Sequence, residues 1–392
     1  MSFGAYIHIP YCIQRCSYCD FATYVQNEIL PPDKYVSLVL EEISQRNFFD
    51  SKQKLDTIYF GGGTPSLIPA ELIVSLIRGL EKNGYCLGPA PEITIEINPA
   101  TVDEKKLEIY LENGINRFSV GAQTFDDALL KLVKREHNAQ KTKETLALLK
   151  KYKLNYSFDI LFALPTQTKE GLQKDIDIAL ELGAKHISPY CLTIPSAHPL
   201  SKGRPPEDEQ IEMFELISAN LLRSGYRQYE ISNFSLPGFE SKHNILYWDD
   251  QDYWGLGLSA HSYSKQSKWG TRFWNPSTIA AYEEQIKKNV NLKFHHPDKV
   301  LEKTQYEILM QHQAATDFCH TSLRMMRGLS QAALKTKFTK STVNAVEIIL
   351  NSLLHRELLQ FDNEHWSLTK KGQLVSNLVF SETTFLAEDL PV

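Results

Sequence analysis

The chain has 392 residues, with 42 Lys and Arg against 47 Asp and Glu, so its formal net charge is −5. This balance gives no global positive field for a phosphate backbone, and we expect no nucleic-acid partner. The sequence has no apolar stretch of about 18 residues that could span a bilayer, so we expect no direct membrane insertion. Met1–Ala5 has no basic start before an apolar run, which predicts a cytoplasmic protein.

Short β-rich segments alternate with longer amphipathic segments such as Asp33–Phe49 and Pro69–Lys82. This alternation is typical of a parallel sheet with crossover helices. It predicts an α/β fold, a partial (β/α)6 TIM-like barrel, whose ligands would lie at the carboxyl ends of the strands. The six predicted strands are Ala5–Ile9, Thr57–Phe60, Ile93–Ile97, Arg117–Gly121, Ser157–Phe162 and His186–Tyr190.

The second half of the chain has a different pattern. After a predicted helix at Glu207–Ser224, the segment Gln228–Thr271 is dense in Tyr, Trp, Asn and Gly and shows no clear period. Helical patterns then return and end in a hairpin with the turn signal Asp362-Asn363, which predicts a small winged-helix-like α+β domain. We therefore expect a barrel at 1–227, an aromatic connecting region at 228–296 and a C-terminal domain at 297–392. The predicted C-terminal elements are helices at Lys299–Phe318, Ser330–Lys337 and Ser341–Arg356 and a hairpin at Leu358–Leu368.

Three of the six cysteines, Cys12, Cys16 and Cys19, lie within eight residues directly after the first predicted strand. In a reducing compartment such a group indicates metal ligands rather than disulfides. Three thiolates suit a [4Fe-4S] cluster that keeps one iron open. Zinc is the alternative, but a closed zinc site needs a fourth ligand, for which His8 is a candidate.

Polar or glycine residues follow the other predicted strands. Gly61–Ser66 follows the second strand, and its glycines would let the backbone approach a ligand closely. Glu96 lies in an apolar run, where a charge is costly unless it is paired, so it is either a solvated strand end or an acceptor for a ribose hydroxyl. Gln123, Arg135 and Asp159 repeat this placement of polar groups near strand ends.

The Cys-x3-Cys-x2-Cys motif resembles the radical S-adenosylmethionine (SAM) superfamily. Together with Tyr6-Ile7-His8-Ile9-Pro10, Glu96-x-Asn98-Pro99 and Gly121-x-Gln123, it is similar to the oxygen-independent coproporphyrinogen III oxidase family over nearly the whole chain. The resemblance implies a cluster on the three cysteines and SAM contacts from Tyr6, Gly62 and Glu96. It also implies that Gly63, Thr64, Gln123, Arg135 and Asp159 occupy positions which contact a second SAM in the oxidases.

One position departs from the oxidase pattern. The oxidases read Cys-x-Cys at the end of the motif, whereas this chain has Phe21 in the last position. That feature, the short N-terminus and the string His243-Asn244-Ile245-Leu246-Tyr247-Trp248 are shared with the second branch of the family, the heme chaperones, in which this string is associated with heme.

The residues of this string allow two interpretations. His243 is a competent axial ligand for heme iron, and Tyr247 and Trp248 offer flat faces to a porphyrin, so with Asn244 they are the heme-associated candidates. The alternative is a hydrogen-bonded structural histidine beside core aromatics. His261, among glycines, is a second candidate ligand. Cys86, Cys191 and Cys319 are expected to be buried small apolar residues.

The resemblance thus implies a heme chaperone that carries a [4Fe-4S] cluster and exchangeable SAM, with heme as cargo for an acceptor hemoprotein or respiratory-chain protein. A coproporphyrinogen III dehydrogenase and a radical methyltransferase acting on a tetrapyrrole are the enzymatic alternatives. A transcriptional regulator that uses the winged-helix-like unit is a third class. The sequence leaves open whether the chain is an enzyme.

Overall fold

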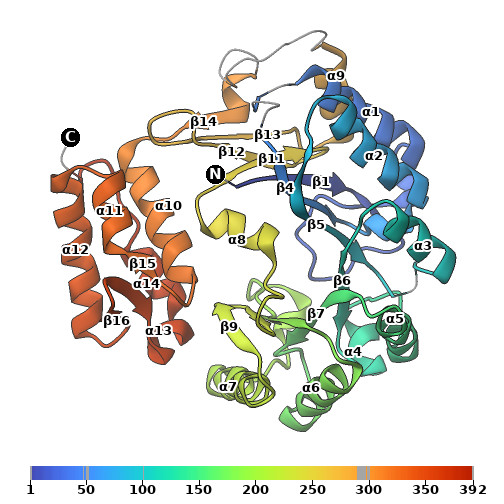
Figure 1. The fold of residues 1–392 in the computed structure, drawn as a ribbon. Coiled ribbons are helices and arrows are strands. Elements are labelled where there is room, and N and C mark those ends of the chain that lie inside the picture. Colours follow the sequence, from blue (N-terminus) through green and yellow to red (C-terminus); the bar gives the residue numbers. More distant parts are fainter. Residues whose placement is uncertain are drawn as a thin grey trace.

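The computed structural model describes residues 2–46, 48–49, 53–99, 101–288, 297 and 301–390. A curved sheet of 12 strands runs through the described residues, and helices lie along its outer side (Figure 1). Its central strands are parallel neighbours in chain order, which confirms the predicted partial barrel. These strands are β1 (Phe3–Ile9), β4 (Leu55–Gly62), β5 (Leu87–Ile97), β6 (Arg117–Gln123), β7 (Asn155–Phe162) and β8 (His186–Cys191).

The outer helices bury apolar stripes against the sheet. In α1 the side chains of Tyr35, Val39 and Ile43 recur every four residues and are buried, as the 3.6-residue period of a helix requires. The predicted helices in this half of the chain are confirmed, although α1 ends at Gln45. The helices are α1 (Pro32–Gln45), α2 (Ala70–Lys82), α3 (Glu104–Glu112), α4 (Asp127–Leu132), α5 (Ala139–Lys151), α6 (Lys169–Leu182) and α7 (Glu207–Arg223).

The segment without a clear period extends the sheet at both edges. Strand β10 pairs antiparallel with β8, and β11 pairs parallel with β1. Each of these strands has only three to five residues, too few to produce a recognisable alternation in the sequence. The elements are β9 (Arg227–Glu230), β10 (Asn233–Ser235), α8 (Lys242–Trp248), β11 (Asp252–Leu256), β12 (His261–Ser264), β13 (Thr271–Trp274) and α9 (Ile279–Lys288).

The predicted helix at Lys299–Phe318 is wrong over its first part. Strand β14 (Tyr306–Ile308) pairs there with β13, and this pairing satisfies the backbone groups that a helix would have used. Helix α10 (Gln311–Arg324) begins only after Met310, whose backbone N–H donates to Gln313 Oε1 at 2.8 Å. Lys299 and Val300 lie outside the described residues.

The C-terminal residues form an α+β unit with its own apolar core, which includes Cys319, Leu350 and Trp366. The predicted hairpin is present and belongs to a three-stranded antiparallel sheet in the order β15-β17-β16. In Figure 1 this unit, in orange and red, lies to one side of the barrel. The division of the chain into three domains stays a prediction. The elements are β15 (Leu329–Ser330), α11 (Gln331–Lys337), α12 (Lys340–His355), β16 (Leu359–Asp362), β17 (His365–Leu368), α13 (Lys370–Leu374) and α14 (Ser376–Glu382).

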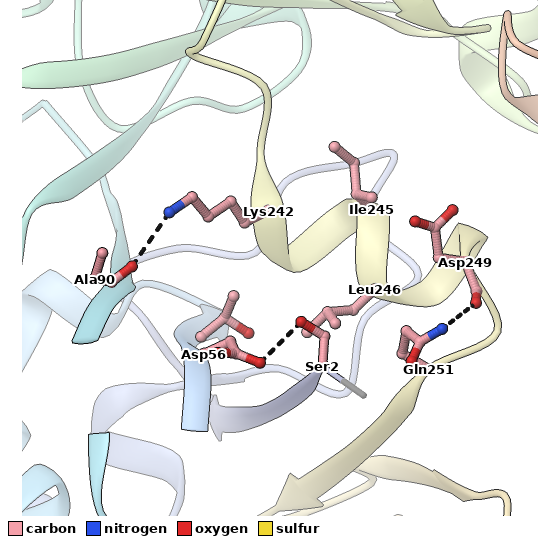
Figure 2. Close-up of a pocket in the computed structure, with 9 residues that line it drawn as sticks. Ser2, Asp56, Ala90, Lys242, Ile245, Leu246, Asp249 and Gln251 are labelled. Carbon is pink, nitrogen blue, oxygen red and sulfur yellow. Dashed lines mark hydrogen bonds between the residues drawn. The ribbon is translucent and has the colours of Figure 1, made fainter. Parts of the chain in front are cut away.

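Helix α8 covers the amino ends of the central strands. Figure 2 shows it above Ser2 and Asp56. Residues of the helix and these two residues line a cavity of about 530 Å³. Lys242 Nζ donates to the carbonyl oxygen of Ala90 at 3.2 Å, which links the helix to the start of β5. This cavity is therefore at the opposite end of the barrel from the cysteines, which follow the carboxyl end of β1. In the described parts of the chain, no helix is long and apolar enough to cross a membrane.

Candidate functional site

A cavity of about 390 Å³ opens at the carboxyl ends of the parallel strands, and we call it the strand-end cavity. Parallel strands bring the residues that follow them to one edge of the sheet, and so side chains far apart in sequence meet here. Ten of the predicted site residues line it: Cys12, Cys16, Cys19, Gly62, Gly63, Thr64, Glu96, Gln123, Arg135 and Asp159.

The cysteine loop lies between two short paired strands, β2 (Tyr11–Cys12) and β3 (Tyr24–Val25). Its backbone is fixed by two hydrogen bonds of 3.3 Å, from Ser17 N–H to the Val133 carbonyl and from Cys19 N–H to the Cys16 carbonyl. Burial, followed by the charges of Cys19 and Cys16, raises the pKa of the Cys12 thiol to about 11. Ionisation of this thiol would be favoured by positive charge from a bound group, which a cluster of iron ions would supply.

A single zinc ion fits these residues less well. Among the described residues, no group of three His, Cys, Asp or Glu side chains is placed to hold one metal ion. The proposed fourth zinc ligand, His8, has both ring nitrogens in hydrogen bonds, Nδ1 with Tyr6 Oη at 3.0 Å and Nε2 with the Ala22 carbonyl at 2.9 Å. A cubane makes a different demand on the three cysteines, because each thiolate binds a different iron.

The glycines beside the cysteine loop are required by close packing. A Cβ on Gly63 would lie 2.5 Å from the Tyr11 carbonyl oxygen, and a Cβ on Gly62 would lie 2.5 Å from the His8 ring. Gly62 also has φ of +113°, a backbone conformation that L side chains rarely adopt. Gly62 and Gly63 thus pack against the residues that lead into the cysteine loop, and both line the strand-end cavity.

Two carboxyl groups in the cavity are costly to ionise. Burial raises the pKa of Glu96 to about 7, although Tyr59 Oη donates to its Oε1 at 2.8 Å and Gly62 N–H to its Oε2 at 3.2 Å. Burial also raises the pKa of Asp159 to about 6. Such shifts are common where a protein holds charges ready for a ligand.

Arg135 contacts the cysteine loop from outside it, after α4. Its Nη1 donates to Cys16 Sγ at 3.5 Å and its Nη2 donates to the Gly121 carbonyl at 2.6 Å. A Cβ on Gly121 would lie 2.9 Å from the guanidinium, so glycine there makes room for it. Gln123 ends β6 with φ of +67°, and its side chain also lines the cavity.

Tyr6 lies outside the strand-end cavity, in the barrel interior next to it. Its ring stacks on Tyr59 with ring centroids 6.1 Å apart, and it lines a neighbouring cavity of about 370 Å³. The structure therefore places Tyr6 beside Gly61 and Glu96 rather than facing the cysteines.

His243 lies in the interior at the other end of the barrel, and 1% of its surface is exposed. Its Nδ1 shares a hydrogen bond of 2.7 Å with Thr57 Oγ1, and its Nε2 shares one of 2.8 Å with Tyr247 Oη. The ring stacks on Tyr59 at 5.0 Å. Burial, followed by the charge of Arg117, lowers the pKa of His243 to about 3. These contacts fit the second interpretation given in the sequence analysis, a hydrogen-bonded structural histidine beside core aromatics.

The other residues of the string point in different directions. Tyr247 contacts Tyr253 edge-on at 4.5 Å and reaches the 370 Å³ cavity. Trp248 instead lies under the Arg324 guanidinium of α10, 4.6 Å from its ring centroid. Asn244 is half-buried, and its backbone N–H donates to Ser241 Oγ at 3.4 Å. The four residues do not form one flat surface.

Two of the remaining cysteines differ from the prediction. Cys319 is buried in the C-terminal core as expected, whereas Cys191 is half-buried and Cys86 is exposed. Cys86 lies in the turn before β5, where its N–H donates to the Gly84 carbonyl at 3.1 Å and its carbonyl accepts from the Leu55 N–H at 2.9 Å, and its side chain is exposed.

The sequence analysis missed Tyr59, Ser119 and Tyr190. Ser119 and Tyr190 line the strand-end cavity, and Tyr59 donates to Glu96 while it stacks on His243. The signal for Tyr59 was its position two residues before Gly61, since alternate residues of a strand share one face.

Residues 6–179 match the family model described as the Radical SAM superfamily. The chain is 33% identical to the heme chaperone HemW of Lactococcus lactis subsp. lactis (strain IL1403), over 99% of this chain and 98% of that protein. It is 32% identical to the heme chaperone HemW of Bacillus subtilis (strain 168), over 98% and 99%. The coproporphyrinogen III oxidase HemN of Escherichia coli has a similar fold, with a TM-score of 0.80 at 20% identity, covering 98% of this chain and 90% of that one.

The family model, the two relatives and the solved structure agree with one another and with the sequence motifs of this chain. The likeness to the oxidase shows the α/β barrel fold, and the two full-length relatives are specific to one branch of the superfamily. This chain belongs to the HemW family of the radical SAM superfamily.

Proposed function

We propose that this protein is a heme chaperone, which binds heme and passes it to an acceptor hemoprotein or respiratory-chain protein. The observation that carries the proposal is its similarity to two proteins named heme chaperones along nearly their whole length. Phe21 supports the same conclusion, because it stands where the oxidase branch has a fourth cysteine.

The same proposal includes a [4Fe-4S] cluster and SAM in the strand-end cavity. Cys12, Cys16 and Cys19 would supply three thiolates and leave one iron open for the cofactor. Glu96 would accept a hydrogen bond from a ribose hydroxyl, and the backbone of Gly62 would lie against the cofactor. When bound, the two groups together supply one-electron chemistry at a sulfonium, while the protein positions them and excludes water.

Arg135 has a separate role in this proposal. Its hydrogen bond to Cys16 Sγ places a positive charge beside the residues that would hold the cluster. Tyr59 and Gly62 hold the Glu96 carboxyl in place before a ligand arrives. The groups that would meet the cofactor are thus held by neighbours on rigid strands.

The test is heme titration of the protein after anaerobic reconstitution of its cluster, alongside an assay for decarboxylation of coproporphyrinogen III. We expect a saturable Soret change and no protoporphyrinogen. Iron and sulfide analysis of a Cys16→Ser variant, compared with the exposed Cys86→Ser, tests the cluster, and only the first variant should lose iron.

The two assays separate the alternatives. Decarboxylation without saturable heme binding would overturn the proposal and make the chain a biosynthetic enzyme. Transfer of a labelled methyl group from SAM to a tetrapyrrole would overturn it in favour of a methyltransferase.

A further inference from the structure

His243 has no free ring nitrogen for an iron ion. Both nitrogens are hydrogen-bonded, and its ring lies between Tyr59 and Tyr247 in the core. To reach a heme, the ring would have to break its bond with Tyr247 and leave a site in which only 1% of its surface is exposed. Buried polar groups that lose their partners are costly, so this movement is unfavourable.

His261 presents the opposite situation. It is exposed on β12, and its imidazole makes no hydrogen bond with any residue that the structure describes. The ring stacks on Trp274 with ring centroids 5.7 Å apart and an interplanar angle of 24°. Burial of part of the ring, followed by the charge of Arg272, lowers the pKa of His261, which favours the neutral form that binds iron.

His261 also stands at the edge of an aromatic cavity. The cavity of about 370 Å³, which we call the His261 cavity, is lined by the rings of Phe21, Tyr247 and Tyr253 as well as by His261. Tyr6 lines the same cavity. The strand pairing brings it near Tyr253, because Tyr253 pairs with Gly4 of β1 and alternate residues of β1 put Gly4 and Tyr6 on the same face. Aromatic faces around one free imidazole are suited to a porphyrin with an axial ligand.

The His261 cavity shares a wall with the strand-end cavity. Asp20 and Phe21, which directly follow Cys19, line both. Phe21 is 63% exposed, so its ring is accessible to a bound group. A group bound by the cysteine loop would therefore lie close to the second cavity in sequence and in space.

We propose that heme binds in the His261 cavity, with a ring nitrogen of His261 as the axial ligand of the iron and Phe21 against the porphyrin face. This inference rests on the proposed heme function and assigns it to a different residue from His243. His243 is then a structural residue of the barrel interior, which packs against Tyr59 and Tyr247.

The test is hemin titration of the cluster-reconstituted full chain as wild type, His261→Ala, His243→Gln and, as an exposed control histidine, His355→Ala. We expect His261→Ala to lose the wild-type Soret position and to weaken binding about tenfold or more, as loss of a metal ligand does. Added imidazole should restore the Soret position in that variant. His243→Gln, once its thermal melt shows that it is folded, and His355→Ala should keep the wild-type Soret position.

The outcomes are distinct. If His261→Ala keeps the wild-type Soret position and affinity while wild type binds heme saturably, the assignment to His261 is overturned and the chaperone function stands. The same holds if folded His243→Gln alone loses the Soret signal. If wild type binds no heme, both proposals are overturned.

Discussion

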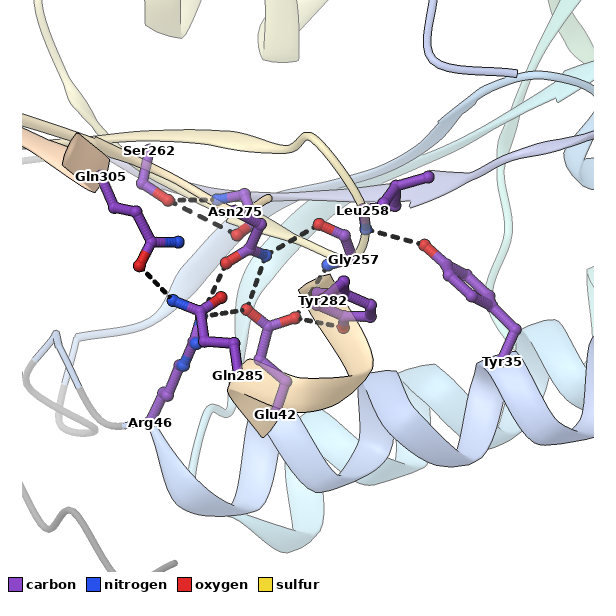
Figure 3. A network of polar contacts seen from close by, with 11 residues as sticks. Tyr35, Glu42, Arg46, Gly257, Leu258, Ser262, Asn275, Tyr282, Gln285 and Gln305 are labelled. Carbon is purple, nitrogen blue, oxygen red and sulfur yellow. Dashed lines mark hydrogen bonds and ion pairs between the residues drawn. The ribbon is translucent and has the colours of Figure 1, made fainter. Parts of the chain in front are cut away.

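Glu42 and Glu96 are both carboxylates inside the protein, but their surroundings differ. The Glu42 carboxylate accepts four hydrogen bonds: from Arg46 at 2.9 Å, from Asn275 at 2.7 Å, from the Gly257 N–H at 2.9 Å and from Tyr282 at 2.7 Å (Figure 3). Glu96 accepts two, and burial raises its pKa to about 7. The Glu42 carboxylate has its hydrogen bonds supplied by the chain itself, whereas the Glu96 carboxylate can still accept hydrogen bonds from a ligand.

The difference also distinguishes what each region does. The Glu42 network ties α1 to Gly257 and Asn275, the residues that flank the strands of His261 and Trp274. It therefore holds in place the strands that carry His261 and Trp274. The strand-end cavity instead places Glu96, Asp159 and Arg135 around an open space. A buried carboxylate with all its hydrogen-bond partners indicates a structural role, and one with few partners beside a cavity indicates a role in binding.

The largest expected effect comes from breaking the complete network. Glu42→Ala leaves Arg46 as a buried cation without its carboxylate, and we expect the free energy of unfolding to fall by about 3–5 kcal/mol. Chemical denaturation measures this change. Glu41→Ala, one residue away and half-buried, is the control and should change the free energy by less than about 0.5 kcal/mol. Equal effects of the two substitutions would show that the network has no special role.

The second prediction concerns Glu96 in the protein without cofactors. Its pKa is about 7 when folded and near 4.5 when unfolded, so the folded chain holds more protons between these values. The free energy of unfolding must then fall as pH rises from 4.5 to 7, by up to about 3 kcal/mol. Glu96→Gln removes this contribution, although Asp159, Arg135 and Tyr59 still face the site.

Denaturation of wild type and Glu96→Gln at pH 5 and pH 7.5 measures the difference. The variant should gain stability relative to wild type at the higher pH. Parallel pH profiles for the two proteins would contradict the raised pKa.

The third and smallest effect concerns His243, whose two ring nitrogens both have hydrogen-bond partners but whose ring can be protonated at low pH. Its pKa is about 3 when folded and 6.5 when unfolded, so the unfolded chain binds more protons in between and stability is lost as pH falls. Between pH 6.5 and pH 5 this loss is about 2 kcal/mol. Arg117, Glu92 and Tyr247 are the charged or titratable neighbours.

His243→Gln should therefore lose less stability than wild type when the pH is lowered to 5, as measured by thermal melts at both pH values. His355→Gln, at an exposed position of α12, is the control and should behave as wild type. An unchanged acid sensitivity in His243→Gln would contradict the buried, neutral histidine.

Much of the barrel could be predicted from the sequence, because its buried parallel strands are continuous apolar runs between helical patterns. The pairing of β11 with β1 could not, since it joins residues about 250 positions apart through strands too short to show a period. The predicted helix at Lys299–Phe318 failed for a related reason: Tyr306–Ile308 takes its conformation from the sheet edge that it meets.

The candidate site divides in the same way. The cysteines, glycines and Glu96 could be predicted because each directly follows a strand. The burial of His243 could not, because it depends on α8 lying across the amino ends of the strands, where Thr57 and Tyr247 take up its nitrogens. The His243–Trp248 string alone does not indicate which of its side chains remains free to bind a ligand.

The most direct test of the contrast between the two carboxylates is SAM titration of cluster-reconstituted wild type and Glu96→Gln between pH 6 and pH 8. If Glu96 is held ready for a ligand, wild type should bind SAM more tightly as pH rises through about 7, because the carboxylate form accepts a hydrogen bond from the ribose hydroxyl. The Glu96→Gln variant should bind SAM weakly at every pH in this range. Equal affinity of the two proteins at every pH would contradict the account.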